Sequence, residues 1–335
     1  MFTTSTQKKF WLYADESELL KARCEANAKF IEKHGAHMKE EERSEFFLSA
    51  NDEKILLRQY ELQLRDFCRR FEPIMPKSVA GTAFHYFKRF YLIHSVMDYH
   101  PKEILVTCVY LACKVDEFNV SINQFVSNVR GNQSKAMDII LNNELLLMQV
   151  LNYNLTIHNP FRPIEGLLID IKTRSQMVNP ERLRPGIEDF LDKAFLTSAP
   201  LLVAPSQLAL AAILHSASKI GENLDNYVTQ TLLGSSGTER LTSLVEAVRK
   251  VRSMIKSMET TPKEIIRALE KRLEKCRNQE NNPDSEIYKQ KQHQALQEED
   301  EMYGANYPTM GVGVDLKFGD EDFYASELSR SVSSP

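Results

Sequence analysis

Residue groupings that could perform chemistry on their own are sparse in this chain. The sequence contains no Walker-type GK[ST] loop, no G-x-G-x-x-G, no kinase H-R-D or D-F-G, no H-E-x-x-H and no nucleophile elbow. Cys108 and Cys113 lie about 140° apart around a helix, so they are poorly placed to share a metal. His34 and His37 stand in a polar stretch and are interpreted as a solvated pair. We therefore expect no cofactor and no metal, and a binding module more than an enzyme.

One pair of charges is better placed to act on a partner. Lys114 ends an apolar helix and shares a face with Leu111, while Glu144 and Met148 share a face of a second helix. If these helices are neighbours, a cation and an acid edge a shallow apolar pocket, suited to the polar backbone and apolar side chain of a partner helix. Alternatively, Lys114 only complements the carboxyl end of its helix and Glu144 is solvated. Spacing alone favours this second interpretation.

Composition predicts that helices position these residues. The chain has 335 residues, room for roughly two domains of about 150 residues. Apolar residues make up 42% and charged residues 26%, as in soluble globular proteins. Of the 12 glycines, only Gly81 and Gly131 fall between positions 50 and 160, too few for the turns of an all-β fold. We therefore expect an all-α protein.

Charge and cysteine usage exclude several classes of protein. The net charge is -4, but residues 298–335 hold nine acids against two basic residues, which leaves +3 for residues 1–297. That body is too weakly charged for a dedicated nucleic-acid binder. The five cysteines are odd in number and scattered, which indicates reduced thiols in the cytosol or nucleus. The first residues lack a signal-peptide core, and Pro200 and Pro205 divide the uncharged stretch 194–218 into two short helices, so no membrane span is expected.

Apolar periodicity predicts two successive bundles of five helices over residues 51–257. The helix that begins at Pro101 is apolar on all sides over residues 104–113, so it should form the centre of the first bundle. The helix that begins at Pro205 is likewise apolar on all sides over residues 208–214. LACK (111–114) and SASK (216–219) lie 105 residues apart, a weak internal repeat. The ranges expected to be helical are 52–71, 78–94, 101–114, 121–129 and 134–151, then 162–172, 185–198, 205–220, 223–233 and 238–257. Ser134 can cap the helix 134–151, whose apolar stripe runs through Met137, Ile140, Leu141, Leu145, Met148 and Leu151.

Further segments flank the two bundles. A helix over residues 15–33, capped by Asp15, precedes them. A last helix after residue 260 is signalled by a capping box of Thr261, Pro262 and Glu264, and its apolar stripe can dock on the body or on a partner. Residues 281–335 lack a sustained apolar period and are expected to be disordered, with transient helix around 285–297. The stripe of the last helix consists of Ile266, Leu269, Leu273 and Cys276.

Four segments resemble the cyclin family. LACKVDEFNVS (111–121) and NNELLLMQVLNYNL (142–155) are similar to the stretch in which cyclins place a lysine and a glutamate against their kinase. KSVAGTAFHYFKRFYLIHSVMDYHP (77–101) and HNPFRPIEGLLIDIKTR (158–174) are similar to one branch of that family. The resemblance covers about residues 1–280. It implies an N-terminal segment with a helix (1–50), a first, kinase-binding cyclin box (51–155), a second box (156–257), a C-terminal helix (258–280) and a disordered acidic tail (281–335).

The resemblance also implies which residues bind the kinase. Lys114 and Glu144 match the pair that contacts the main chain beside the kinase's regulatory helix. Val115 departs from the aromatic residue common in the family, which puts its contact in doubt, and in the second box Arg249 stands where the acid partner of Lys219 would be needed. Only the first box should therefore bind the kinase. The positions that match the hydrophobic pocket for the regulatory helix are Leu111, Met148, Tyr153 and Leu155.

The function implied by the resemblance is that of a non-catalytic regulatory subunit. The branch activates the cyclin-dependent kinase of the CDK-activating kinase, CAK, which is also the kinase module of TFIIH. Its implied partners are this kinase, a RING-finger assembly subunit and the TFIIH core, in the nucleus, with no direct nucleic acid and no membrane. The implied substrates are kinase activation loops and the RNA polymerase II C-terminal domain. The first box helix reads DEKILLRQYELQLRDF and the single tryptophan is Trp11, so the substrate-docking patch of cell-cycle cyclins is not expected.

Two rival interpretations remain open. A nucleic-acid-binding transcription factor of the TFIIB type has the same fold, and residues 240–277 hold eleven Lys and Arg against five Glu. Acids are interleaved there, which favours a solvated helix face, and no C-x-x-C for a zinc ribbon exists. A helical scaffold that binds no kinase is the other rival.

Overall fold

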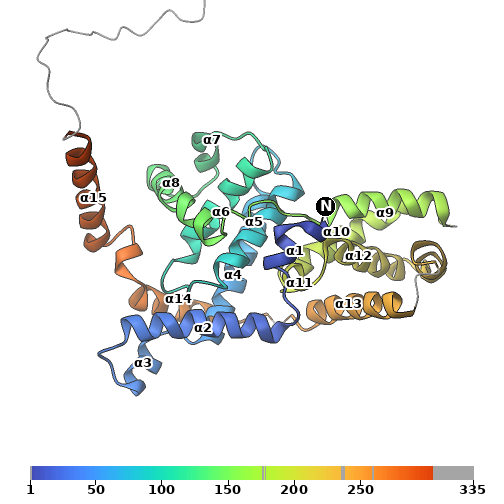
Figure 1. The fold of residues 1–335 in the computed structure, drawn as a ribbon, viewed down its shortest axis with the longest axis horizontal. Coiled ribbons are helices and arrows are strands. Elements are labelled where there is room, and N and C mark those ends of the chain that lie inside the picture. The colour runs from blue at the N-terminus through green and yellow to red at the C-terminus, as the bar shows by residue number, and fades with distance from the viewer. Residues whose placement is uncertain (1, 176, 178, 235–237, 259, 305–335) are drawn as a thin grey trace, which may run out of the picture. The chain divides into compact units, whose positions relative to one another are not determined.

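The computed structural model describes residues 2–304 except 176, 178, 235–237 and 259. Within these residues the chain forms helices and no strand (Figure 1). The described residues divide into two compact units, with the division after Tyr288. The expected disorder, with only transient helix around residues 285–297, is wrong for residues 286–304, which form helix α15 (Glu286–Gly304). Ser285 Oγ accepts a hydrogen bond from the backbone N–H of Tyr288 in the first turn of this helix. The expected disorder of residues 305–335 lies outside the described residues.

The N-terminal segment contains η1 (Phe2–Thr4), α1 (Thr6–Phe10), α2 (Glu16–His34) and α3 (Glu40–Phe46). Asp15 caps α2 as expected, because its side chain accepts a hydrogen bond from the backbone N–H of Glu18. Helix α2 buries Leu19 and Phe30 and packs on α4 of the first bundle.

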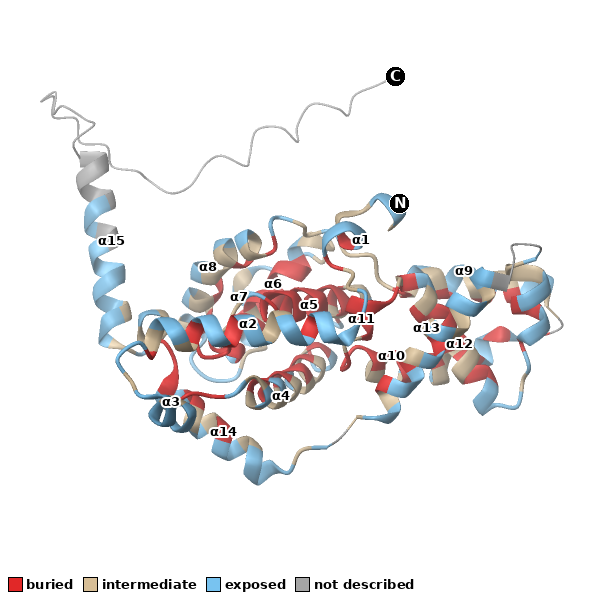
Figure 2. Ribbon diagram, turned by 60° about the horizontal axis from the view of Figure 1, so that its bottom comes forward, coloured by how far each residue is buried: buried red, intermediate tan, exposed pale blue. Residues whose placement is uncertain are grey.

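The first bundle comprises α4 (Ala50–Arg69), α5 (Lys77–Phe90), α6 (Pro101–Val115), α7 (Ile122–Ser127) and α8 (Gln133–Val150). Helix α6 packs against α4, α5 and α8, and nearly all of its side chains from 104 to 113 are buried (Figure 2). The prediction that it forms the centre of the bundle is confirmed. Helix α8 starts earlier than expected, because Asn132 and not Ser134 is the N-cap, accepting a hydrogen bond from the N–H of Lys135.

The second bundle repeats this plan. It comprises α9 (Phe161–Arg174), η2 (Pro180–Leu183), α10 (Arg184–Ala194), α11 (Ala199–Leu202), α12 (Pro205–Lys219), the π-helical segment η3 (Tyr227–Leu232) and α13 (Thr238–Lys256). Helix α12 packs against α9, α10 and α13. Like α6, it opens on a proline and is buried along most of its length, as predicted.

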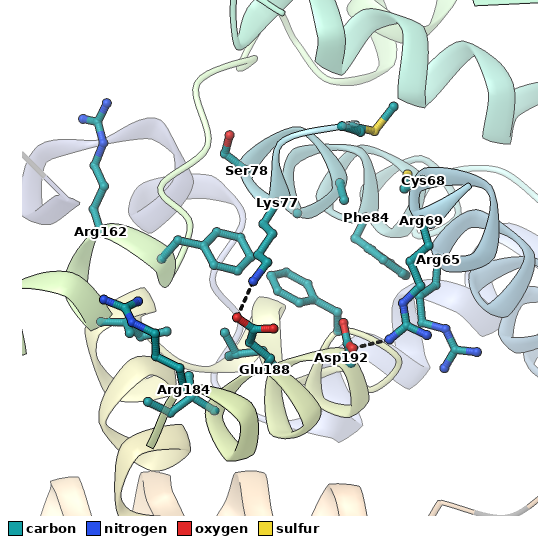
Figure 3. Close-up of a pocket in the computed structure, with 18 of the residues that line it drawn as sticks. Arg65, Cys68, Arg69, Lys77, Ser78, Phe84, Arg162, Arg184, Glu188 and Asp192 are labelled. Atoms are coloured by element: carbon teal, nitrogen blue, oxygen red, sulfur yellow. Dashed lines mark hydrogen bonds and ion pairs between the residues drawn. The ribbon is translucent and has the colours of Figure 1, made fainter. Parts of the chain in front are cut away.

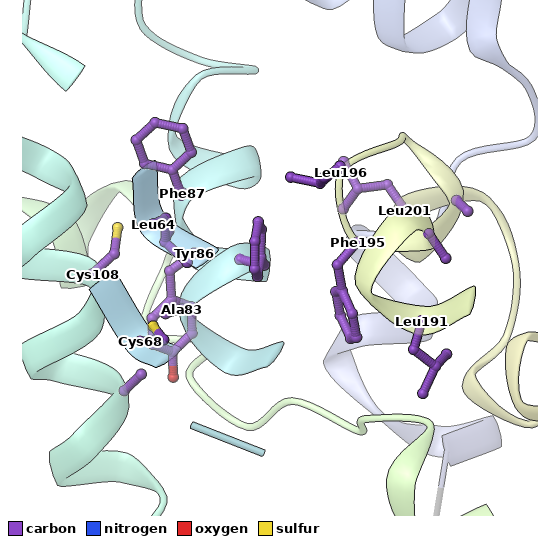
Figure 4. Packing of buried hydrophobic residues seen from close by; sticks show 14 of the residues in the cluster. Leu64, Cys68, Ala83, Tyr86, Phe87, Cys108, Leu191, Phe195, Leu196 and Leu201 are labelled. Atoms are coloured by element: carbon purple, nitrogen blue, oxygen red, sulfur yellow. The ribbon is translucent and has the colours of Figure 1, made fainter. Parts of the chain in front are cut away.

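Aromatic rings join the two bundles. The Phe195 ring lies 5.6 Å from Phe84 and 6.0 Å from Phe161, both stacked, and Figure 4 shows apolar side chains of the two bundles facing each other. A cavity of about 740 Å³ opens beside these rings, between α4 and α5 on one side and α9 and α10 on the other. The ion pairs Lys77–Glu188 and Arg69–Asp192 cross it (Figure 3). These two ion pairs bridge the bundles at an exposed surface, where such pairs contribute little to stability.

The last helix of the first unit, α14 (Lys263–Cys276), docks on the body and not only on a partner. It buries Leu269, Leu273 and Cys276 and packs on α4 and α3. The expected capping box is wrong, because Pro262 occupies the N-cap in an extended conformation and no side chain caps the helix. Beyond the helix, Arg277 Nη2 donates to Glu103 Oε1 of α6 at 2.9 Å.

Candidate partner-binding site

Lys114 and Glu144 meet at the surface between α6 and α8. Lys114 Nζ lies 2.7 Å from Glu144 Oε1, and it also lies 5.4 Å from the centre of the Tyr110 ring. The Lys114 side chain is 50% exposed and the Glu144 side chain 15% exposed. The alternative interpretation treats Lys114 as a lone cation at a helix end and Glu144 as a solvated acid. It does not describe this geometry, because the two side chains are paired. The two charges form one polar group that remains accessible from outside.

The four apolar residues expected at the pocket differ in exposure. Tyr153 is 60% exposed, Met148 and Leu155 are half-buried, and Leu111 is buried in the core. Leu111 therefore supports the surface from below and offers little area to a partner. Val115, which departs from the family pattern, is half-buried and packs against the core.

Sequence reasoning missed two apolar residues on the outer face of α8. Leu141 and Leu145 are 51% and 55% exposed, and they share a helix face with Glu144 and Met148. They were expected on the buried stripe, whereas the core side of α8 is formed by Ile140, Leu147 and the following Leu151. The sequence does contain a signal for them: the apolar stripe of this helix is wider than one buried face, so some of its residues must be exposed.

Tight turns follow both helices of the site. Glu117 after α6 and Asn152 and Tyr153 after α8 have φ of 57°, 49° and 56°, a left-handed conformation that costs energy in residues other than glycine. The second turn is held by hydrogen bonds, from the Tyr153 N–H to Met148 O at 2.9 Å and from Tyr86 Oη to Leu155 O. Such fixed turns hold Tyr153 in one place beside the end of α8.

A buried arginine ties the N-terminal segment to the same turn. Arg89 of α5 donates from Nη1 to the carbonyl of Asn154 at 3.2 Å, and its guanidinium lies 4.9 Å from the Trp11 ring. Burial lowers the pKa of Arg89 to about 9. Gln7 of α1 forms two further hydrogen bonds with the backbone of His158. Trp11 is 4% exposed, so it belongs to the core and to no docking patch.

The second bundle uses the equivalent lysine differently. Lys219 Nζ lies 3.2 Å from Asp189 Oδ2 of α10, and Lys193 binds the same carboxylate at 2.9 Å. Arg249 is exposed on α13. Lys219 therefore pairs with an acid on α10, whereas Lys114 pairs with an acid on α8, the last helix of its bundle. The two lysines do not have equivalent partners.

The positive segment 240–277 is divided between two helices that pack on different parts of the protein. Its residues are divided between α13, which packs on α12 and α10, and α14, which packs on α4 and α3. A phosphate backbone needs basic residues clustered on one surface. This arrangement does not favour the TFIIB-type alternative.

Groups for metal or thiol chemistry are not gathered in the part of the chain that the structure describes. No cluster of His, Cys, Asp or Glu there could hold a metal ion. Burial raises the pKa of Cys276 to about 11 and that of Cys113 to about 12, so these thiols stay protonated at neutral pH. Among the described helices, none is both long and apolar enough to cross a membrane.

Comparisons with known proteins identify the family. The cyclin N-terminal domain matches residues 58–156, and the cyclin C-terminal domain matches residues 159–256. Cyclin-H of Xenopus laevis is 46% identical over 284 residues, covering 84% of this chain and 88% of the relative. Cyclin-H1-1 of Arabidopsis thaliana is 30% identical, covering 82% of this chain and 88% of the relative.

Solved structures share the fold. A chain from the CAK complex of Chaetomium thermophilum bound to ATP-gamma-S has a TM-score of 0.72 at 23% identity, covering 93% of this chain and 98% of that one. A chain from the yeast TFIIK complex of Kin28, Ccl1 and Tfb3 has a TM-score of 0.55 at 23% identity, covering 75% and 99%. With both cyclin domains matched and cyclin-H proteins as relatives over most of their length, the chain belongs to the cyclin family, in its cyclin-H branch.

Proposed function

We propose that this chain is the regulatory subunit of a cyclin-dependent kinase and contributes binding energy but no chemistry. The observation that carries the proposal is the accessible Lys114–Glu144 pair, flanked by the exposed Leu141 and Leu145. Exposed apolar side chains beside a half-exposed charged pair are typical of a surface that a partner covers. The cyclin-H relatives, and the structures of the same fold that come from a CAK and a TFIIK complex, support a kinase as that partner.

The chemistry of the pair suits a helix-bearing partner. The lysine ammonium has three donors, of which Glu144 takes one, and the carboxylate keeps acceptor positions beyond the one used by Lys114. The pair can therefore bind both a carbonyl and an N–H of a partner's main chain. Met148, Tyr153 and Leu155 would contact the partner's apolar side chains, with Leu111 beneath them.

Activation then follows from a population shift. A protein kinase needs the ion pair between its β3 lysine and the glutamate of its regulatory helix in place. A subunit that binds only the inward position of that helix stabilises the competent state. A change from 1% to 99% of the competent state requires about 10⁴-fold preference, or about 5.5 kcal/mol.

The same reasoning extends to the assembly. We infer that the kinase is the catalytic subunit of CAK, shared with TFIIH, and that its substrates are kinase activation loops and the RNA polymerase II C-terminal domain. A RING-finger assembly subunit and the TFIIH core are the further partners, and the nucleus is the location. The branch of the family and the CAK and TFIIK complexes that contain the structural relatives support these assignments.

The role of the charge pair is tested by reversing the charge of the paired lysine, once in each bundle. Lys114→Glu should weaken association with the purified cognate kinase by about 2–5 kcal/mol, because it places two acids side by side where the partner docks. Lys219→Glu is the matched control, since Lys219 is equally exposed and also paired with an acid. Binding is measured by calorimetry and activation by kinase assay. Equal losses in the two variants would contradict the proposal.

The apolar flank is tested in the same way. Leu145→Ser should weaken kinase binding without lowering the melting temperature, because the side chain is 55% exposed. Ile169→Ser on α9 is the control, since Ile169 is 65% exposed on the second bundle. Unchanged kinase affinity of Leu145→Ser would show that α8 does not face the kinase.

A further inference from the structure

Thr261 has a hydroxyl group without a hydrogen-bond partner in the described part of the chain and stands directly before a proline. It does not cap α14, and among the described residues nothing forms a hydrogen bond with its side chain. It is followed by Pro262, and a Ser or Thr before a proline occurs in this sequence only at Thr261 and Ser334. Ser334 lies outside the described residues.

The backbone around Thr261 is suited to entry into an enzyme's active site. Residues 257–262 join α13 to α14, and from Thr260 to Pro262 the chain is neither helical nor part of a strand. Thr260 and Pro262 are exposed and Thr261 is half-buried. The residue before a proline is confined to extended conformations, which is how a kinase cleft accepts a substrate segment.

Thr261 also lines a cavity with an excess of positive charge. The cavity, of about 440 Å³, is walled by α2, α4, α5 and the end of α13, by the chain between α10 and α11, and by the connection from α13 to α14. Four cations against two carboxylates leave an excess of two positive charges. These residues are Arg23, Lys54, Arg58 and Lys88, with Glu16 and Glu61.

Two guanidinium groups in the cavity have donors to spare. Lys88 is paired with Glu61, and their side chains are only 2% and 9% exposed. Arg58 donates from Nη1 to Leu196 O at 3.3 Å, and Arg23 Nε is buried without a hydrogen-bond partner. Burial lowers the pKa of Lys88 despite Glu61, and the nearby charges of Arg23 and Arg58 lower this pKa further. The cations repel one another, and an anion would relieve that repulsion.

We propose that Thr261 is a phosphorylation site for a proline-directed Ser/Thr kinase, and that Arg23 and Arg58 bind its phosphate in this cavity. The Thr261 oxygen attacks the γ-phosphorus of MgATP, the bond from that phosphorus to the β–γ bridging oxygen breaks, and ADP leaves. The hydroxyl proton passes to the base of the modifying kinase. The reaction needs no other reactant.

The phosphate fits the cavity in charge. A phosphothreonine carries about -1.5 to -2 charges at neutral pH, which matches the excess of two cations. Charge-assisted hydrogen bonds to guanidinium groups would tie the α13–α14 connection to α2 and α4. Phosphorylation should therefore raise the melting temperature of the chain by about 3–6 °C.

Modification of the folded chain is the first test. The full-length protein is incubated with a recombinant mitogen-activated protein kinase and MgATP, and the products are mapped by mass spectrometry. We expect phosphate on Thr261 and no phosphate at this position in Thr261→Val. Thr260→Val is the control and should still be phosphorylated on Thr261, because Thr260 is not followed by a proline. Phosphorylation of Thr261 only after the chain has been unfolded would overturn the proposal.

Phosphorus NMR tests the cavity separately. The second pKa of phosphothreonine 261 should lie about 1–2 units below that of the same group in a synthetic phosphopeptide of residues 255–267, because nearby cations favour the dianion. Arg23→Gln or Arg58→Gln, checked for folding by circular dichroism, should move this pKa toward the peptide value. A pKa equal to that of the peptide in the intact chain would refute binding in the cavity.

Discussion

Glu53 makes the stability of this protein depend on pH in an unusual direction. Its side chain is buried on α4, where it accepts a hydrogen bond from Ser95 Oγ. Burial raises the pKa of Glu53 from 4.5 to about 7, although the hydrogen bonds of Ser95 and Asn27 oppose this rise. The carboxyl group is therefore partly protonated at neutral pH.

The sign of the effect follows from proton linkage. The folded chain holds the Glu53 proton more tightly than the unfolded chain, so stability is fully present below pH 4.5 and is lost as the pH rises toward about 7. At about 1.4 kcal/mol per pKa unit, the loss amounts to roughly 3 kcal/mol above neutral pH. Glu53→Gln resembles the protonated form, so it should be more stable than the wild type by about 2–3 kcal/mol at pH 8.5 and equal to it near pH 4.5.

Urea unfolding followed by circular dichroism from pH 4.5 to 8.5 measures this difference. Glu45→Gln on α3 serves as the control, because it removes a carboxyl group that is exposed to solvent. If Glu53→Gln and the wild type show the same pH dependence, the carboxyl group is not the titrating group and the reasoning is refuted.

Two further variants test how charge and close approach stabilise the helices. Lys88→Met should cost about 3–5 kcal/mol of unfolding free energy because it leaves the Glu61 carboxylate buried and unpaired, and adding Glu61→Gln should recover most of this loss in a double-mutant cycle. Gly81→Ala should cost about 1–3 kcal/mol, since its Cβ would lie 2.3 Å from Asn159 Oδ1, whereas the helical Gly166→Ala, with open space around its Cβ, should be neutral or stabilising; both are compared by urea unfolding.

The sequence was sufficient to predict the long helices of the two bundles and which of them are central, but not the short helices α1 and α3 or the helix α15. Asp15 is the N-cap of α2, as expected. The all-apolar helical stretches 104–113 and 208–214 lie at the centres of the two bundles. The N-cap residue was predicted wrongly for two helices. Asn132, not Ser134, is the N-cap of α8, and Pro262, not Thr261, is the N-cap of α14. Capping depends on the backbone angle at one residue, which neighbouring packing decides.

The site was predicted in part. The proximity of Lys114 and Glu144 depends on α6 and α8 being neighbours, a tertiary fact that spacing within one helix does not contain. The exposure of Leu141 and the burial of Leu111 depend on how each helix is rotated about its axis. Buried charges such as Lys88 on an aromatic helix were not predicted, because their partners lie on other helices.

One double variant separates docking from internal stabilisation. Lys114→Glu combined with Glu144→Lys keeps the ion pair between α6 and α8 but exchanges the charges that a partner meets. If the pair contacts the kinase, the double variant should regain the wild-type melting temperature and still bind the kinase at least 10-fold more weakly. Recovery of wild-type kinase affinity would mean that the pair only holds two helices together, and the account of this surface as a kinase-binding site would be contradicted.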